Sequence, residues 1–421
     1  MKPGYKQTEV GVIPEEWKTP TLDSVAKRGS GHTPDKKHLE YWDGDIKWVS
    51  LKDSDALDRV YIDETAATIT RAGIANSSAV VHPAGTVVLS RDAGVGKSAI
   101  MKSAMAVSQH FMAWQCGPCL DNHFLYYWLQ SEKSEFERIA IGNTIKTIGL
   151  SYFRALNIPL PPLPEQRAIA GALSDVDTLI GALDQLIAKK RDLKQATMQQ
   201  LLTGQTRLPG FSGKWEVKRL GDVATLNRLN VIPASLPTQM FVHFSLPAFD
   251  AGKAPVTEPG AAIGSNKFRV PQGAVLVSKL NPRIPRVWAP DDIPPEAIAS
   301  TEFLVLTPRE GTSSRFLFVL CSSPLFCEQM ELAATGTTGS HQRISPDGAL
   351  SLKVSVPVDV EEQTAIAEVL SDMDAELAAL EQRRDKTRSL KQGMMQELLT
   401  GKTRLVDSGK LRVESGERRT S

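Results

Sequence analysis

The sequence has few cysteines and no long apolar run. Four cysteines in 421 residues are too few to cross-link a secreted scaffold, so a reducing compartment is expected. No stretch reaches the roughly 18 consecutive apolar residues of a membrane-spanning helix, and the first residues lack the apolar core of a signal peptide. These absences predict a cytoplasmic protein that does not enter a membrane.

The chain also lacks an excess of charge of either sign. Its 49 Lys and Arg residues against 48 Asp and Glu residues give a net charge of +1, so any basic surface for nucleic acid must be local. A hydrophobic content of 41% and a charged content of 23% are typical of globular proteins and exclude disordered or fibrous chains. The length predicts two or three domains.

No pattern in the sequence indicates a catalytic centre. The 7 histidines are scattered, no Ser–His–Asp arrangement stands out, and the glycine-rich loop of a methyltransferase cofactor site is missing. Residues 94–98 resemble the end of a phosphate-binding loop, but Arg91 stands where that motif requires glycine. We therefore predict no catalytic residue, no metal ligand and no cofactor bound by this chain.

One cysteine pair leaves alternatives open. Cys116 and Cys119 have the Cys-x-x-Cys spacing of thioredoxin-like redox sites, although Trp114 lies one residue too early for that pattern. Together with His123 they provide three possible zinc ligands, but no fourth ligand is obvious. A structural role is the simplest interpretation, and the redox and zinc hypotheses remain to be tested.

Two segments of the chain repeat each other. Residues 165–208 align without gaps with residues 362–405, with 26 identities in 44 positions. The preceding parts, 30–145 and 228–340, show little similarity beyond one β-rich run. This contrast predicts that the chain is built twice from one plan. The shared part then has one fixed role, and the variable part has two different ones.

The shared segment is predicted to form a long helix. Its apolar residues recur with a period of 3.5, which is typical of a coiled-coil seam. Prolines precede the first copy, and Gly204 and Gly401 are natural C-terminal stops. Each helix then has about 38–40 residues and a length of about 57–60 Å. The predicted seam consists of Ile169, Leu173, Val176, Ile180 and Leu183 in the first copy, and of Ile366, Leu370, Met373, Leu377 and Leu380 in the second.

A single helix cannot bury such a thin stripe, so the simplest partner is the other copy. Because a globular part must fit between the copies, we expect an antiparallel pair. Packing of each helix on its own domain is the alternative. The second half of each helix is rich in Lys and Arg, which suits either a solvated face or a docking surface for another protein.

The expected fold class is α+β, with two mixed α/β domains separated by a pair of long antiparallel coiled-coil helices in an internal pseudo-twofold repeat. Expected elements are β-rich runs at 85–90 and 273–278, buried helices at 122–130 and 314–321, and closing strands at 158–160 and 354–356. The predicted boundaries are a first domain at 1–160, a first helix at 161–204, a second domain at 205–357, a second helix at 358–402 and a polar tail at 403–421.

Three kinds of segment are candidates for DNA contact. Residues 266–286 contain five cations and no acid, a composition that suits contacts to phosphates and guanine edges. The turn at 91–98 is rich in glycine, which lets backbone N–H groups approach an anion. The third kind, 143–147 and 340–343, precedes each closing strand. Solvated loops are the alternative reading. The candidate residues are Arg91, Lys97, Ser98, Lys146, Thr147, Lys267, Arg269, Lys279, Arg283, Arg286, Gln342 and Arg343.

Several motifs resemble the specificity subunit of type I restriction–modification enzymes. They are the sequences IPEEW at 13–17 and YWDGDIKWV at 41–49, the segment IPLPPLPEQ at 158–166, the LLTG helix ends and the tandem arrangement. The second copy departs from the pattern, because 357–363 has lost most of the prolines. The resemblance covers residues 10–405.

This resemblance implies two target recognition domains, each reading one half of a bipartite, asymmetric site on double-stranded DNA. The helices would fix the spacing and dock two methylation subunits, which carry S-adenosylmethionine and methylate adenine. Restriction subunits, which use ATP and Mg, would complete the complex, and this chain would have no catalysis of its own. A coiled-coil scaffold that binds proteins, or a redox enzyme, are the alternatives.

Overall fold

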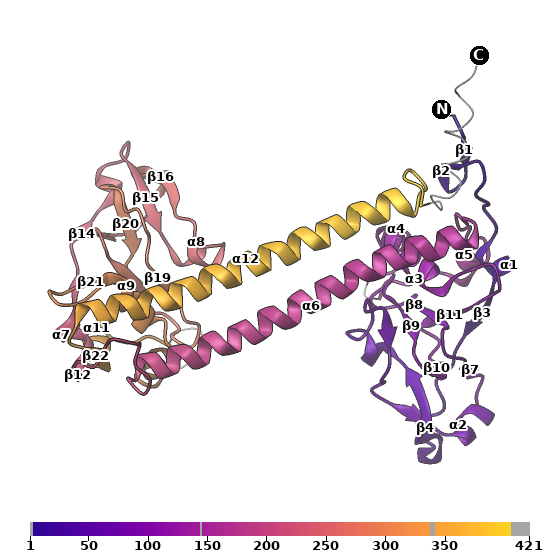
Figure 1. The fold of residues 1–421 in the computed structure, drawn as a ribbon, viewed down its shortest axis with the longest axis horizontal. Helices are drawn as coiled ribbons and strands as arrows, with labels where there is room; N and C mark the ends of the chain where they lie inside the picture. The colour runs from indigo at the N-terminus through magenta and orange to yellow at the C-terminus, as the bar shows by residue number, and fades with distance from the viewer. Residues whose placement is uncertain (1–2, 144, 337–341, 406–421) are drawn as a thin grey trace. The chain divides into compact units, whose positions relative to one another are not determined.

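The computed structural model describes residues 3–143, 145–336 and 342–405. Among these residues, no helix is long and apolar enough to span a membrane. The chain forms two compact units, which we describe separately: unit 1 contains Met1–Leu183 and Arg383–Ser421, and unit 2 contains Asp184–Gln382. Each unit holds one mixed α/β domain and one half of each of two long helices (Figure 1), which confirms the predicted fold class.

The described residues of unit 1 form three β-sheets, all of which include antiparallel pairs. A two-stranded sheet pairs β1 with β2, a four-stranded sheet has the order β6-β4-β10-β7, and a five-stranded sheet has the order β3-β11-β8-β9-β5. The strands are β1 (Tyr5–Thr8), β2 (Gly11–Pro14), β3 (Ala26–Ser30), β4 (Trp42–Val49), β5 (Tyr61–Ile62), β6 (Thr68–Ile69), β7 (Val81–His82), β8 (Val87–Ser90), β9 (Ser98–Met101), β10 (Met105–Val107) and β11 (Phe111–Cys116).

The helices of unit 1 are short, apart from α3 (Asn122–Ser131), which the sequence predicts as a buried helix. Asp121 caps α3 by accepting hydrogen bonds from two backbone N–H groups of its first turn. Phe124 and Tyr127 of α3 are buried in one core cluster with Trp17 and Trp114. The others are α1 (Leu22–Val25), η1 (Leu39–Tyr41), η2 (Leu51–Asp53), α2 (Arg71–Ala75), α4 (Lys133–Ile139) and α5 (Leu150–Arg154).

Unit 2 contains sheets of the same sizes. They pair β12 with β22, and have the orders β13-β21-β18-β19 and β14-β17-β20-β15-β16. The strands are β12 (Trp215–Arg219), β13 (Ala224–Asn227), β14 (Asn230–Val231), β15 (Met240–Phe244), β16 (Val256–Pro259), β17 (Lys267–Arg269), β18 (Val275–Ser278), β19 (Val287–Trp288), β20 (Ala297–Ser300), β21 (Phe303–Pro308) and β22 (Lys353–Pro357). The helices are α7 (Leu220–Val223), η3 (Pro233–Ser235), α8 (Leu246–Asp250), η4 (Gly260–Ala262), α9 (Ser314–Cys321), α10 (Pro324–Leu332) and α11 (Pro346–Leu350).

The two variable parts share one topology despite their unlike sequences. The order β3-β11-β8-β9 in unit 1 matches β13-β21-β18-β19 in unit 2. The order β6-β4-β10-β7 likewise matches β16-β15-β20-β17, including one parallel pair in each sheet, β4 with β10 and β15 with β20. The repeat therefore extends through the whole plan and is not confined to the similar segments.

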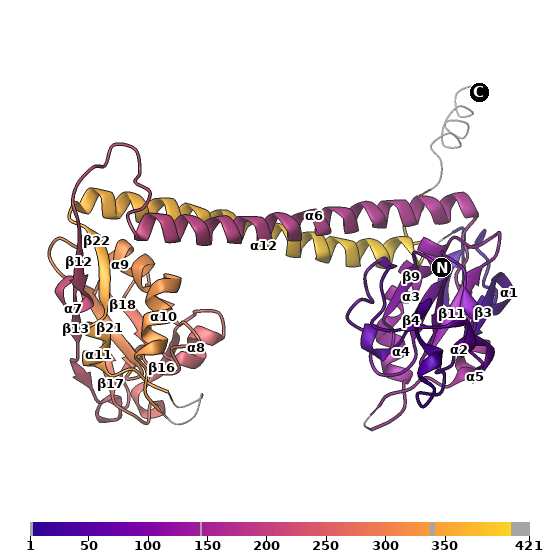
Figure 2. The ribbon, with the colours of Figure 1, turned by 90° about the horizontal axis from the view of Figure 1, so that it is seen from below.

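The two long helices are α6 (Leu163–Leu202), with 40 residues, and α12 (Val360–Leu398), with 39 residues. Both lengths agree with the prediction. Gly204 and Gly401 follow the helix ends and each has a φ of +70°, a conformation that glycine adopts without steric cost. Figure 2 shows the four- and five-stranded sheets of each unit on one side of its own helix segments.

Within each unit the helix halves are antiparallel and share the core with the domain. In unit 1, Ile169 and Leu173 from the start of α6 are buried in one cluster with Leu398 from the end of α12. In unit 2, Met198 from the end of α6 is buried with Ile366 from the start of α12. The other predicted seam residues are buried or half-buried: Val176, Ile180, Leu183, Leu370, Met373, Leu377 and Leu380. Each helix half thus packs on both its domain and the other helix.

Ion pairs join the basic half of each helix to the acidic half of the other. In unit 2, Lys190 lies 2.7 Å from Glu376, Arg191 bonds Glu381, and Lys194 bonds Asp374. In unit 1, Lys391 lies 2.7 Å from Asp177. From the sequence we expect the basic half of each helix to be a solvated face or a docking surface. Four of the cations in these halves instead pair with acidic residues of the other helix.

One predicted strand is not formed. Residues 158–160 make only isolated bridges, Lys18 with Leu160 and, just before them, Thr21 with Asn157. The counterpart in unit 2 is a regular strand, β22, that pairs with β12 over five residues. The run Pro161-Pro162 and Pro20 lack backbone N–H groups, so the ladder in unit 1 cannot extend.

Candidate nucleic-acid interface

Three chain segments meet at the end of the central strand in each unit. In unit 1, the Arg91 N–H that follows β8 donates to the His110 carbonyl at 2.9 Å, and the Ile148 N–H donates to the Arg91 carbonyl at 3.0 Å. In unit 2, the Lys279 N–H that follows β18 donates to the Glu302 carbonyl at 2.9 Å, and Ile344 donates to Lys279 at 3.1 Å. The same hydrogen bonds therefore build the same junction twice.

A pair of backbone hydrogen bonds between two further residues completes each junction. Thr147 exchanges two backbone hydrogen bonds with Ile141 in unit 1, and Arg343 does so with Thr335 in unit 2. Thr147 also forms an isolated β-bridge with Asp92. Two kinds of segment that the sequence analysis proposes separately, the turn after the β-rich run and the loop before the closing segment, thus lie side by side. We call this surface the strand-end face of each unit. It consists of residues 91–92, 109–110 and 147 in unit 1, and of residues 279, 301–302 and 342–343 in unit 2.

The two strand-end faces carry different side chains on the same frame. The equivalent positions are Arg91 and Lys279, Gln109 and Thr301, His110 and Glu302, Thr147 and Arg343. In unit 1, His110 Nδ1 lies 2.7 Å from the Asp92 carboxylate. In unit 2, the Arg343 guanidinium contacts both carboxylate oxygens of Glu302, at 3.2 and 3.3 Å. The side chains are held in place, and their hydrogen-bonding groups differ between the units.

In unit 1, the predicted contact residues differ in accessibility. Lys146 is exposed, and Arg91 is half-buried with its Nε 3.5 Å from Asp92. Lys97 is half-buried and donates to the Ser54 carbonyl at 3.0 Å. The structure corrects the candidate set at Ser98, which is fully buried in β9 and bonded to Gln130, so its hydroxyl cannot reach DNA. Thr144 lies outside the described residues.

In unit 2, one candidate is also removed. Lys267 is buried and donates to Ser265 at 2.6 and 3.0 Å, and burial lowers the pKa of its ammonium group. Arg286 is held by two hydrogen bonds to Asp250 at 2.7 and 2.9 Å.

The remaining candidates of unit 2 lie nearer to solvent. Arg283 is exposed, whereas Lys279 and Gln342 are half-buried at the strand-end face. Arg269 is half-buried and donates to the Pro295 carbonyl. Ser340 and His341 lie outside the described residues.

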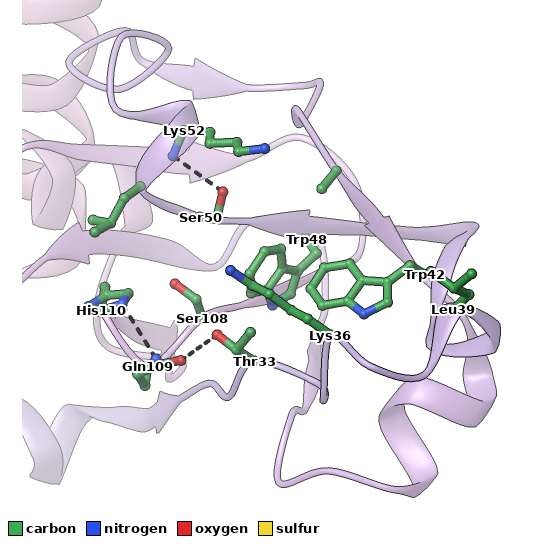
Figure 3. Close-up of a pocket in the computed structure, with 12 residues that line it drawn as sticks. Thr33, Lys36, Leu39, Trp42, Trp48, Ser50, Lys52, Ser108, Gln109 and His110 are labelled. Carbon is green, nitrogen blue, oxygen red and sulfur yellow. Dashed lines mark hydrogen bonds between the residues drawn. The ribbon is translucent and has the colours of Figure 1, made fainter.

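A groove of about 550 Å³ in unit 1 escapes the sequence analysis (Figure 3). Two indole rings line it, Trp42 and Trp48, packed edge to face with centroids 5.1 Å apart. Lys36 and Lys52 add cationic side chains, and Ser108, Gln109 and His110 contribute polar groups. His110 connects the groove to the strand-end face. Trp42 and Trp48 belong to the motif at 41–49, so this motif is the part of the sequence that could have indicated the groove.

The surroundings of Cys116 do not favour redox chemistry or zinc binding by the cysteine pair. Cys116 ends β11, and burial raises the pKa of its thiol to about 12, so the reactive thiolate is scarce at neutral pH. His123, the third possible ligand, bonds the Tyr61 hydroxyl at 2.7 Å. In the part of the chain that the structure describes, no group of three or more His, Cys, Asp or Glu residues is arranged to hold a metal ion. A redox or zinc site therefore gains no support.

This chain is similar in sequence to specificity subunits of type I restriction enzymes. The type I restriction enzyme MjaIX specificity subunit of Methanocaldococcus jannaschii is 29% identical over 233 residues, which cover 52% of this chain and 54% of that protein. This chain thus matches about half the length of that relative. The MjaVIII specificity subunit of the same organism is 23% identical over 414 residues, covering 93% of this chain and 94% of that protein.

Solved structures show the same fold. The type I restriction–modification system S subunit from M. genitalium has a TM-score of 0.55 at 17% identity and covers 94% of this chain and 99% of that one. The family model of the type I restriction modification DNA specificity domain matches residues 14–189 and again residues 212–387. The chain therefore belongs to the family of type I restriction–modification DNA specificity domains, of which it carries two in tandem.

Proposed function

We propose that the strand-end face of each unit reads one half of a bipartite, asymmetric site on double-stranded DNA. The observation that carries this proposal is the repeated junction with unlike side chains. Unit 1 presents Gln109 and His110 where unit 2 presents Thr301 and Glu302. Because base edges are distinguished by their donors and acceptors, two such faces select different sequences. The family membership, which is that of a DNA specificity domain, supports this reading.

The long helices fix the spacing between the half-sites in this proposal. Each is continuous over 40 or 39 residues, and ion pairs between facing charges hold the antiparallel register within each unit. A helix is a stiff spacer, whereas a flexible linker would permit many separations. Half-sites read from one side of a duplex lie a whole number of turns apart, about 34–36 Å per turn.

The helices also dock two methylation subunits in this proposal. Leu193 in unit 2 and its repeat counterpart Leu390 in unit 1 are 51% and 59% exposed, which leaves the same apolar residue uncovered in both units. A repeated surface suits two copies of one partner. S-adenosylmethionine, ATP and Mg then act in the methylation and restriction subunits, and the complex works in the cytoplasm. This chain supplies recognition and leaves the chemistry to its partners.

An exchange of one variable part tests the proposal. Residues 228–340, which lie in unit 2, would be replaced by the corresponding residues of a relative with a different DNA site. The hybrid would be produced with its methylation subunits, and methylated adenines would be mapped across the host genome. We expect one half-site to change while the other half-site stays the same. A change in both half-sites, or methylation without a bipartite site, contradicts the proposal.

A further inference from the structure

The groove of unit 1 contains an amide side chain whose orientation is fixed. Gln109 is exposed in the turn between β10 and β11, between Thr33 and His110 (Figure 3). The Thr33 hydroxyl donates to Gln109 Oε1 at 2.7 Å. On the other side, Gln109 Nε2 lies 3.4 Å from His110 Nε2. The side chain is therefore held from both sides although it faces solvent.

The carboxylate of Asp92 determines which way the amide points. A carboxylate only accepts hydrogen bonds, so the proton of the neutral His110 ring is on Nδ1, which faces Asp92 at 2.7 Å. His110 Nε2 then carries a lone pair and accepts from the amide N–H of Gln109. A flipped amide would place Oε1 against that lone pair, which is unfavourable.

The hydrogen-bonding groups of Gln109 that Thr33 and His110 do not use match those of one base. An amide has two donors and two acceptor lone pairs, and Thr33 and His110 use one acceptor and one donor. One donor and one acceptor are left at the exposed end. Adenine presents the complementary pair in the major groove, the N7 acceptor and the N6 amino donor, and glutamine binds it with two hydrogen bonds.

A second observation indicates that the groove takes a polar ligand. The hydroxyl of Ser108, the residue before Gln109, lines the groove and is 1% exposed, and it has no hydrogen-bond partner among the described residues. A buried polar group without a partner is destabilising unless a ligand supplies one. Lys36 and Lys52 line the same groove with exposed side chains, as expected for contacts to a DNA backbone.

We propose that Gln109 reads an adenine in the half-site of unit 1, with Thr33 and His110 as positioning residues and Lys36 and Lys52 in contact with the phosphates. This inference rests on the proposed function and adds the residue and the base. Unit 2 has Thr301, a shorter side chain without an amide, at the equivalent position. The proposed reading of adenine by a glutamine therefore does not apply to the half-site of unit 2.

The test uses the chain with its methylation subunits and a set of duplexes, each with one base pair of the bipartite site replaced. Competition binding and methylated-adenine mapping would be compared for the wild type, Gln109→Ala and the matched control Gln115→Ala, another exposed glutamine of unit 1. We expect Gln109→Ala to lose about tenfold or more of the discrimination at one A·T pair in the half-site of unit 1. The Gln115→Ala variant should keep the wild-type specificity.

Further variants separate base reading from structure. Gln109→Glu keeps the shape and loses the donor, so the preference at that position should move from adenine towards cytosine. Thr33→Val should relax the same position less, and Thr33→Ser should restore it. A uniform loss of affinity on all duplexes, an unchanged specificity, or relaxation in the other half-site overturns the inference. If the wild-type complex shows no bipartite site, the proposed function itself fails, which is a distinct result.

Discussion

Arg404 and Glu165 form a two-pronged ion pair although 239 residues separate them in the chain. The distances are 2.6 Å from Nε to Oε1 and 2.9 Å from Nη2 to Oε2, and the Trp17 indole N–H also donates to Glu165 at 3.1 Å. Arg207 and Glu362 repeat the arrangement in unit 2, at 2.5 and 2.6 Å, with Trp215 as the indole donor. The arginine that follows one long helix thus neutralises the buried glutamate at the start of the other.

Removal of Arg404 should destabilise unit 1. Glu165 is 4% exposed, so Arg404→Ala would leave a buried carboxylate whose remaining donor, among the described residues, is the Trp17 indole. We expect a loss of about 3 kcal/mol in the free energy of unfolding. Calorimetry should show a lower transition for unit 1 and an unchanged one for unit 2, with the reverse pattern for Arg207→Ala. Equal shifts of both transitions in either variant would refute this assignment.

The repeated ion pairs of the helices provide a second comparison. Lys391 and Asp177 in unit 1 occupy the positions of Lys194 and Asp374 in unit 2, but the Tyr127 hydroxyl also donates to Asp177 at 2.9 Å. The Lys391 ammonium lies 5.2 Å from the centre of the Tyr127 ring, which adds a cation–π contact. The pair in unit 1 therefore has more partners than its counterpart.

Double-mutant cycles with alanine measure this difference. We expect a coupling energy of about 1–2 kcal/mol for Lys391 and Asp177, and less than about 1 kcal/mol for Lys194 and Asp374, because Asp374 is exposed and water screens its charge. Denaturant unfolding of the four variants in each cycle gives the coupling. In Tyr127→Phe the coupling in unit 1 should fall towards that in unit 2. Equal couplings in the wild-type background would show that the tyrosine contributes nothing.

The sequence predicts the long helices well because their signals are local. The seam period, the prolines and the two glycines lie within the helices or beside them, and α6 and α12 begin and end within a few residues of the predicted bounds. The repeated Glu-Gln pair is also explained. Gln166 bonds Asp121 N–H, Cys119 O and Pro161 O, as Gln363 bonds Ser313 N–H, Gly311 O and Pro357 O.

The strand-end face is less predictable because its parts come from distant segments. Nothing local shows that Arg91 bonds His110 and Ile148, or that Lys279 bonds Glu302 and Ile344. A count of cations also cannot show where each side chain points. Lys267, for example, is buried and donates to Ser265, so its ammonium group is not available at the surface. Gln109 carries no charge and escapes such a count altogether.

The thiol of Cys116 should react slowly at neutral pH. Burial raises its pKa to about 12 in the folded protein, against an ordinary value near 8.5, so the thiolate is a small fraction at pH 7. In a Cys119→Ser, Cys327→Ser background, the rate of alkylation by iodoacetamide should rise about tenfold per pH unit from 7 to 10. A plateau below pH 9 would show a lowered pKa and would revive the redox hypothesis. Denatured protein, in which the plateau should appear near pH 9, is the control.

The proposed role of the helices as spacers leads to the last prediction. One helical turn adds about 5.4 Å to a helix, and base pairs along a duplex are about 3.4 Å apart. Insertion of four residues near Leu202 and Thr203, where α6 ends, should therefore widen the gap between the half-sites by about one to two base pairs while both half-sites stay the same. Four residues exceed one helical turn by only about 40°, so the domain that follows keeps a similar orientation.

Methylated-adenine mapping of the insertion variant, produced with its methylation subunits, would give the new gap directly. A matched control places four residues in the connection at 209–213, between α6 and β12, where they should leave the gap unchanged because they lie outside the helix. If the helix insertion changes the bases that are read, or if both insertions widen the gap equally, the helices do not set the distance. An unchanged gap in both variants would instead assign the spacing to the partner subunits.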